Sequence, residues 1–352
     1  MSPSPLKTLF WNVTYACNHR CGICFTDSGV ARVAELDTQE ALALVREARD
    51  VGIRDILISG GEPFLRADIV DILSRMGESE ITARIASNGS LLDRELLSRL
   101  KAETLTRSFQ ISLDTVDPRV YAVIHGASAD THGRVLRNLG MIRDMGFHTT
   151  VSVRLTPLTL PGIPALLDAA LREGWATVTV HCPLHTNRAD GAFGQGVDQL
   201  SLLEPVLGHF ERLERRWLIE TYIPWAEYHP VIRRFEGRIR FIHRGCRAGR
   251  DRLTVNPTGK LSPCVCLDVP AARIGDVRKD RLGDVFAASP LCGLFRNPGR
   301  HGICVDCSVL DRCGGGCRAA AYVISGRLDG QDEACPVRKD MPGTMVRIKE
   351  PC

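Results

Sequence analysis

Residues 8–25 read TLFWNVTYACNHRCGICF, and this stretch decides how the rest of the chain is interpreted. A short apolar run leads into three cysteines, Cys17, Cys21 and Cys24, spaced C-x3-C-x2-C. A structural zinc site needs four ligands, and the nearest further donors are His19 and Asp27. Three thiolates on one loop instead suit a four-iron cluster in which one iron has no protein ligand. A zinc knuckle is the alternative interpretation.

The apolar run also opens a pattern that continues to about residue 183. Short β-branched segments such as DILIS (55–59) and SFQISL (108–113) alternate with longer amphipathic segments such as TQEALALVREARDVG (38–52). About six such units predict an α/β fold, a partial (βα)6 TIM-type barrel with helices outside. Ligands of such barrels sit at the carboxyl ends of the strands. The cysteine triplet, GGEP, SNG and SLD follow the first four strands in turn, so we expect these motifs to meet.

The composition limits the classes of function. The 45 Lys and Arg residues against 41 Asp and Glu residues give a net charge of +4, far from the basic excess of a nucleic-acid-binding protein. No apolar run approaches the roughly 20 residues that span a membrane, and the N-terminus lacks a signal-sequence pattern. We therefore expect a cytoplasmic protein that binds neither nucleic acid nor a membrane.

Fourteen cysteines in a cytoplasmic chain indicate metal ligation, because disulfide frameworks belong to oxidising compartments. Three lie at 17–24 and ten at 246–352, and only Cys182 lies between these groups. The sequence therefore predicts two metal-bearing regions. We expect a barrel domain at 1–200, a bridge at 201–245 and a small metal-bearing domain at 246–352.

The cysteine triplet after the first strand resembles the signature of the radical S-adenosylmethionine (SAM) enzymes. The resemblance implies a [4Fe–4S] cluster whose bare iron chelates the amino and carboxylate groups of SAM. It also implies that the GGEP loop meets the methionine amino group, that polar side chains at the ends of the third and fourth strands face the cofactor, and that an arginine pairs with the carboxylate. By matching position, these cofactor-binding residues are Gly60, Gly61, Glu62, Pro63, Asn88, Ser112 and Arg154. Ordinary loop capping and a solvated arginine are the alternatives.

The C-terminal cysteines show a second and more specific spacing. Cys246 is followed by twelve residues, Gly259, four residues and Cys264, and later by a C-x2-C-x5-C-x3-C run and one more cysteine. This pattern resembles the SPASM extension, which implies two auxiliary iron–sulfur clusters. By matching position the outer cluster is held by Cys304, Cys307, Cys313 and Cys335, and the inner one by Cys246, Cys264 and Cys317. The inner cluster lacks a fourth ligand, so either Cys266 or Cys292 reaches in, or one iron is open. A zinc ribbon is the alternative interpretation of the cysteines from Cys304 to Cys335.

The resemblance also implies a reaction class. SAM is cleaved reductively to a 5′-deoxyadenosyl radical, which takes a hydrogen atom from the substrate, and the auxiliary clusters favour a net oxidation by dehydrogenation or cross-link formation. Residues 9–25 and the segment GGEPFLRADIVDIL look most like the peptide-cofactor maturase branch. We therefore expect a ribosomally made peptide precursor of a natural product or cofactor as the substrate. The alternative is a dehydrogenase or epimerase of a small sugar or cyclitol.

Other roles are less defined by the sequence. We expect an electron donor such as flavodoxin or ferredoxin. Because the first strand begins at about residue 7, we expect a leader-peptide-binding domain to be either a separate protein or absent. Cys182 is a candidate hydrogen donor to a substrate radical, although a buried structural thiol is the more ordinary role. No general base can be chosen.

Overall fold

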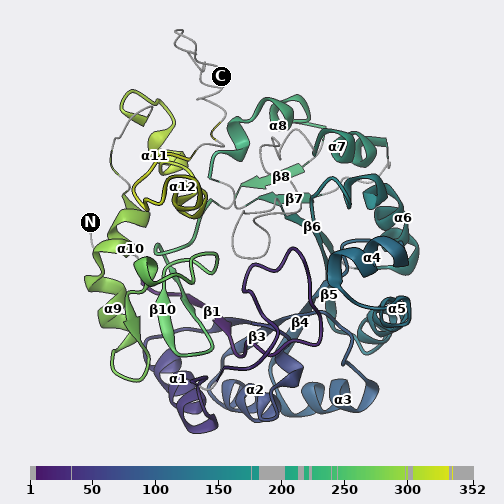
Figure 1. The fold of residues 1–352 in the computed structure, drawn as a ribbon, viewed down its shortest axis with the longest axis horizontal. Helices are drawn as coiled ribbons and strands as arrows, with labels where there is room; N and C mark the ends of the chain where they lie inside the picture. The colour runs from purple at the N-terminus through teal and green to yellow at the C-terminus, as the bar shows by residue number, and fades with distance from the viewer. Residues whose placement is uncertain are drawn as a thin grey trace.

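The computed structural model describes residues 5–32, 34–175, 177–181, 203–212, 218–221, 224–238, 240–243, 245–297, 299, 304–332 and 335. Its first half is a partial barrel of six parallel strands with helices on the outside (Figure 1). The strands are β1 (Thr8–Asn12), β2 (Asp55–Ser59), β3 (Thr82–Ser87), β4 (Thr106–Ser112), β5 (His148–Arg154) and β6 (Thr177–His181). The main helices are α1 (Thr38–Asp50), α2 (Ile69–Glu78), α3 (Arg94–Glu103), α4 (Pro118–His125), α5 (Ala129–Asp144) and α6 (Ile163–Glu173). The predicted α/β partial barrel is confirmed.

The remaining elements follow the barrel. The bridge region contains α7 (Leu203–Arg212), α8 (Pro230–Arg234) and a two-stranded parallel sheet of β7 (Leu218–Thr221) and β8 (Arg240–His243). The C-terminal region contains β9 (Arg252–Val255), β10 (Lys260–Ser262), β11 (Gly275–Asp276), α9 (Leu282–Ala288), α10 (Pro290–Arg296), α11 (Leu310–Cys313) and α12 (Arg318–Ser325). Its strands do not form a separate sheet.

The main sheet has nine strands in the order β11-β10-β9-β1-β2-β3-β4-β5-β6. Strand β9 pairs in parallel with the outer edge of β1, with Thr8 opposite Arg252, while β1 also pairs with β2. The C-terminal region therefore continues the barrel sheet across the predicted boundary at residue 246. This pairing places the loops that follow β9 beside the loop that follows β1.

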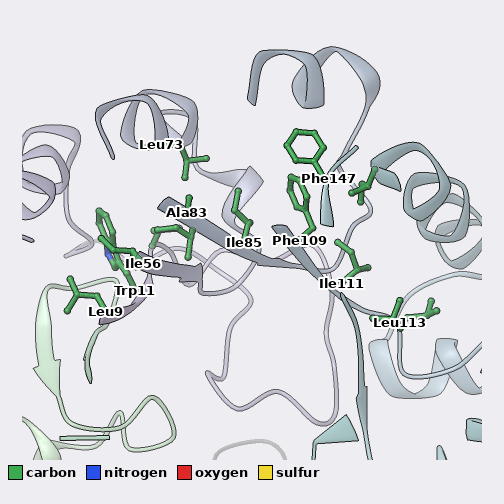
Figure 2. Close-up of a cluster of buried hydrophobic side chains, with 14 of the residues drawn as sticks. Leu9, Trp11, Ile56, Leu73, Ala83, Ile85, Phe109, Ile111, Leu113 and Phe147 are labelled. Carbon is green, nitrogen blue, oxygen red and sulfur yellow. The ribbon is translucent and has the colours of Figure 1, made fainter. Parts of the chain in front are cut away.

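The strands have two different faces, because successive side chains of a strand point to opposite sides. One face packs against the helices and is apolar, as Figure 2 shows for Leu9, Trp11, Ile85, Phe109 and Ile111 among others. The opposite face of β4 and β5 carries the polar residues that alternate with this core, Ser108, Gln110, Ser112, Thr150, Ser152 and Arg154. The barrel therefore encloses a polar interior on this side.

Local signals explain where the helices begin. Helix α1 starts with a capping box, in which Asp37 Oδ1 accepts from Glu40 N at 2.8 Å and Glu40 Oε2 accepts from Asp37 N at 3.0 Å. Helix α4 starts at Pro118 after the capping residue Asp117 and ends at Gly126, whose φ of 58° is left-handed. The carbonyls at this end of α4 face the cysteine loop.

Candidate active site and metal centres

The cysteine triplet lies on the loop between β1 and α1, which extends into the middle of the ring in Figure 1. Backbone hydrogen bonds hold this loop to itself at Gly29, which donates to Tyr15 O at 2.8 Å and accepts from Cys17 N at 3.1 Å. The last carbonyls of α4 hold it from another side, because Arg20 N donates to His125 O at 3.1 Å and Gly22 N donates to Ile124 O at 2.9 Å. The loop is therefore fixed by its surroundings.

Each sulfur of the triplet has its own polar neighbour. The contacts are His19 N to Cys17 Sγ at 3.4 Å, His125 Nδ1 to Cys21 Sγ at 3.3 Å, and Thr26 Oγ1 to Cys24 Sγ at 3.4 Å. Hydrogen bonds to the sulfurs are one of the means by which proteins tune iron–sulfur clusters. The donor set and its surroundings therefore fit a cluster held by three thiolates.

The GGEP loop lies directly against the cysteine loop. Gly61 N donates to Thr14 O and Glu62 N donates to Ala16 O, both at 2.7 Å. A Cβ on Gly61 would lie 2.0 Å from Ala16 O, and one on Gly60, whose φ is 139°, would lie 2.5 Å from Thr14 O. These two glycines therefore permit a close approach between the GGEP loop and the cysteine loop.

Glu62 is fully buried, and its hydrogen bonds join the loop after β2 to the end of β3. Its carboxylate accepts from Ser87 Oγ at 2.9 Å, from Asn88 N at 2.8 Å and from Phe64 N at 3.3 Å. Burial raises the pKa of Glu62 to about 7 in spite of these hydrogen bonds. Pro63 follows as the first residue of the short 3-10 helix at Pro63–Leu65.

The ends of β3 and β4 also reach this region. Asn88 Nδ2 donates to Asn18 Oδ1 at 2.8 Å, and Asn18 Nδ2 donates to Ser90 Oγ at 2.9 Å, so the third strand end contacts the cysteine loop directly. Ser112 is the last residue of β4 and pairs with Ser152 of β5. The predicted meeting of the first three motifs at the strand ends is present in the structure.

Arg154, the last residue of β5, lies beside the same region. Its guanidinium carbon is 5.8 Å from the ring centre of Phe25, which follows Cys24 in the triplet loop. Its backbone N donates to Asp114 Oδ1 at 2.5 Å. The side chain therefore faces the loop from the opposite wall of the barrel.

A buried pair behind Cys21 was missed in the sequence. Asp114 has a left-handed φ of 61°, and its Oδ2 lies 3.0 Å from His125 Nε2. His125 Nδ1 in turn contacts Cys21 Sγ. Burial alone would lower the pKa of His125, but contacts with Asp114 and Cys21 raise it to about 10. No sequence signal identifies His125, because the contact depends on how α4 packs against the loop.

The same region contains a compact group of nitrogen and sulfur donors. In the part of the chain that the structure describes, His19, Cys21 and His125 form the only group of three potential metal donors whose atoms all lie within 4.8 Å of one another. Both ring nitrogens of His19 are buried without a hydrogen-bond partner among the described residues, and burial lowers its pKa to about 4.

The four cysteines of the predicted outer set line one cavity. Cys304, Cys307, Cys313 and Cys335 share it with Trp225 and Asp332. Asp332 Oδ2 accepts from Trp225 Nε1 and from Cys317 N, each at 2.7 Å. The cavity therefore fits a cluster with four thiolate ligands, and Asp332 links it to a cysteine of the inner set.

The three cysteines of the predicted inner set also lie together. Cys246, Cys264 and Cys317 pack against one small apolar cluster that includes Ala248 and Phe295. Burial raises the pKa of Cys246 to about 11, and it likewise raises the pKa of Cys17 and of Cys313 to about 12 each. Raised pKa values favour the protonated thiols, so metal binding at these residues would have to release their protons.

Two further expectations concern other parts of the chain. Cys182, the candidate hydrogen donor, lies outside the described residues. In the described helices no segment is both long and apolar enough to cross a membrane.

The family model of the Radical SAM superfamily matches residues 11–164, which contain the cysteine loop and the strand-end motifs. This chain contains a radical SAM domain. The SPASM model, an iron–sulfur cluster-binding domain, matches residues 246–308. The radical SAM domain binds SAM and a [4Fe–4S] cluster, and the SPASM domain binds auxiliary iron–sulfur clusters.

Three curated relatives are similar over nearly the whole radical SAM chain. The AdoMet-dependent heme synthase of Nitratidesulfovibrio vulgaris is 25% identical over 343 residues, covering 94% of this chain and 92% of the relative. Mycofactocin maturase MftC of Mycolicibacterium smegmatis is 27% identical over 334 residues, covering 93% and 82%. The PqqA peptide cyclase of Granulibacter bethesdensis is 26% identical over 343 residues, covering 94% and 87%.

Solved structures share the fold. SuiB of Streptococcus suis, bound to the precursor peptide SuiA, superposes with a TM-score of 0.75 at 21% identity and covers 94% of this chain and 76% of its own. The protein anSMEcpe with bound AdoMet superposes with a TM-score of 0.65 at 15% identity, covering 93% and 92%. At these sequence identities the structural similarity confirms the partial-barrel fold alone.

Proposed function

We propose that this radical SAM protein is an oxidoreductase that dehydrogenates or cross-links a ribosomally made peptide precursor of a natural product or cofactor. The observation that carries the substrate class is the 26% identity over 343 residues with a PqqA peptide cyclase. The two C-terminal cysteine sets support oxidation, because auxiliary clusters can accept an electron from the substrate. When bound, SAM and the first cluster supply the radical that removes a hydrogen atom from the substrate.

The site residues enter this proposal as ligands and binding groups. Cys17, Cys21 and Cys24 would hold the first cluster. Gly60 and Gly61 would bring the second strand end against that loop, with Glu62 and Pro63 fixing its shape. Asn88, Ser112 and Arg154 would contact SAM, with the Arg154 guanidinium suited to the carboxylate.

The interior of the barrel suits a polar substrate. Gln110, Ser112 and Ser152 lie on the face of β4 and β5 that is turned away from the apolar core. His181 at the end of β6 lies 3.4 Å from Gln110 through its Nε2, and burial lowers the pKa of His181 to about 4. Amide and hydroxyl groups can pair with the backbone of a peptide, which supports this substrate class.

The proposal includes its partners. A flavodoxin or ferredoxin would reduce the first cluster, and a separate protein would hold the leader segment of the peptide. Thiol ligation of iron requires a reducing compartment, which supports a cytoplasmic location.

The activity is tested in two steps under anaerobic conditions. Reconstituted protein with dithionite and SAM should release 5′-deoxyadenosine, measured by mass spectrometry. Cys21→Ala should abolish this release. Cys292→Ala is the matched control, because Cys292 lies in the main apolar core and is not one of the three cysteines of the triplet, and it should leave the release unchanged. Absence of 5′-deoxyadenosine from fully reconstituted protein would contradict the proposed reaction.

The substrate class needs a second assay. Short peptides encoded beside the gene are incubated with the enzyme, and each is examined for loss of two hydrogen atoms. A haem-synthase-type reaction is the second candidate, favoured by the 25% identity over 343 residues with a heme synthase. A tetrapyrrole precursor of haem consumed in place of every peptide would reject the peptide proposal.

A further inference from the structure

The inner auxiliary site holds a fourth thiol that its spacing pattern does not assign. Cys246, Cys264 and Cys317 lie around one apolar cluster, and Cys266 packs against the same cluster. The members of this cluster that are buried are Ala248, Leu267, Ala272, Phe295 and Ala319. Four cysteines therefore surround one small region of the C-terminal domain.

The turn that follows Cys264 places Cys266 beside this ligand. Leu267 N donates to Cys264 O at 3.0 Å, which closes a tight turn and brings Cys266 back beside Cys264. Cys266 therefore lies in the same turn as Cys264 and packs against the same apolar cluster. Cys317 packs against the same apolar cluster as Cys246 and Cys264.

The competing candidate lies elsewhere. Cys292 is fully buried in the main core that joins the sheet to its helices. It lies in the first turn of α10, where its backbone N donates to Ser289 Oγ at 3.2 Å. The groups that affect its thiol are Ser289 and Arg296, and none of the inner cysteines is among them. Cys292 is therefore held by a different part of the fold.

From these contacts we infer that Cys266 is the fourth ligand of the inner auxiliary cluster, so that each of its irons has a cysteine thiolate. The assignment deepens the proposed function, on whose ligand sets it rests. A four-iron cluster with four protein thiolates has no free coordination position. The inner cluster can then exchange electrons, but a substrate cannot bind to its iron.

The surroundings of Cys266 agree with a fixed ligand. Asp268, two residues later, accepts from Tyr15 Oη at 2.5 Å and from Asn256 Nδ2 at 2.8 Å. Tyr15 belongs to the loop that carries Cys17, so the segment after Cys266 is tied to the first cluster loop. This anchoring limits the freedom of Cys266 to move out of the site.

The test isolates the auxiliary clusters. In a parent variant carrying Cys17→Ala, Cys21→Ala and Cys24→Ala, the first cluster is absent and about eight irons should remain in two four-iron clusters. Cyanide, which binds an open iron, is added to the dithionite-reduced protein, and the electron paramagnetic resonance (EPR) spectrum is compared before and after. We expect no change in the parent.

Three further variants in this background decide the ligand. Cys266→Ala should either gain a cyanide-dependent EPR signal or fall from about eight to about four irons. Cys292→Ala, the matched control, should behave as the parent. Cys266→Ser keeps the size of the side chain and should alter the EPR spectrum even where the alanine variant folds poorly.

Three results would overturn the inference: a cyanide response in the parent, a Cys266→Ala spectrum identical to the parent, or an effect of Cys292→Ala in place of Cys266→Ala. Because the parent cannot cleave SAM and no substrate is added, these results are independent of the peptide proposal. A parent without any auxiliary iron would instead contradict the ligand sets of the proposed function.

Discussion

The contact between the GGEP loop and the cysteine loop leads to a quantitative prediction for Gly61→Ala. The added Cβ would lie 2.0 Å from Ala16 O and 2.9 Å from Tyr15 O, and both are backbone atoms that cannot rotate away. The loops would have to separate by about 1.4 Å to restore an ordinary contact of 3.4 Å. This movement would break the hydrogen bonds from Gly61 N to Thr14 O and from Glu62 N to Ala16 O.

The expected cost follows from these two effects. Two lost hydrogen bonds contribute about 1–3 kcal/mol, and the overpacking contributes about 1–3 kcal/mol. We therefore expect the free energy of unfolding to fall by roughly 2–6 kcal/mol, measured by urea denaturation, and the iron bound by the first cluster to fall with it.

Gly140→Ala is the matched control for this variant. Gly140 lies in α5 with no atom within 4 Å of the position of an added Cβ. Alanine there should stabilise the chain by about 0.5–1 kcal/mol, because glycine is the poorer helix former. Equal unfolding free energies for Gly61→Ala and the wild type, with iron uptake intact, would refute the reasoning from close approach.

Three further perturbations test other parts of the site. His125→Gln removes the imidazole that lies 3.3 Å from Cys21 Sγ. Loss of a contact worth about one net hydrogen bond should lower the reduction potential of the first cluster by roughly 50 mV, measured by an EPR-monitored redox titration. An unchanged potential would exclude this influence. The pKa of Glu62 is raised from 4.5 to about 7, so the folded chain binds this proton more tightly than the unfolded chain does. The contribution of this proton to the free energy of unfolding is therefore fully present below pH 4.5 and is lost as the pH rises through 7. Glu62→Gln should flatten this part of the curve of unfolding free energy against pH, and a curve that keeps its slope would contradict the assignment. Trp225→Phe deletes the 2.7 Å hydrogen bond to buried Asp332 and should cost about 1–3 kcal/mol in thermal or urea unfolding, whereas no loss would show that the bond contributes little.

The periodic part of the fold was predictable because it depends on local patterns. Alternation of apolar and polar residues along β4 and β5 is visible in the sequence and corresponds to the two faces of the sheet. The carboxyl ends of parallel strands lie at one edge, so the meeting of the strand-end motifs followed from the order of the elements. The partial barrel and the family resemblance are accordingly confirmed.

The long-range pairings were not predictable from such patterns. Strand β9 lies beside β1 although their residues are more than two hundred positions apart, and no local signal encodes this register. The contact between His125 and Cys21 depends in the same way on how the end of α4 meets the loop. A chain of polar contacts assembled from distant segments leaves no spacing that a single sequence can reveal.

The same long-range contacts explain why a loop with three cysteines can hold its shape. The loop receives backbone hydrogen bonds from the GGEP segment, offers its own to the end of α4, and donates from Tyr15 to Asp268 of the SPASM region. Fixing the backbone of one residue costs about 1–2 kcal/mol of conformational entropy. Folding of the surrounding elements fixes the backbone of the loop before iron binds, so iron binding does not have to order it. Under the proposed function, the triplet could therefore stop at three ligands because the protein supplies rigidity from outside the loop, which would leave the remaining position of the cluster free for SAM.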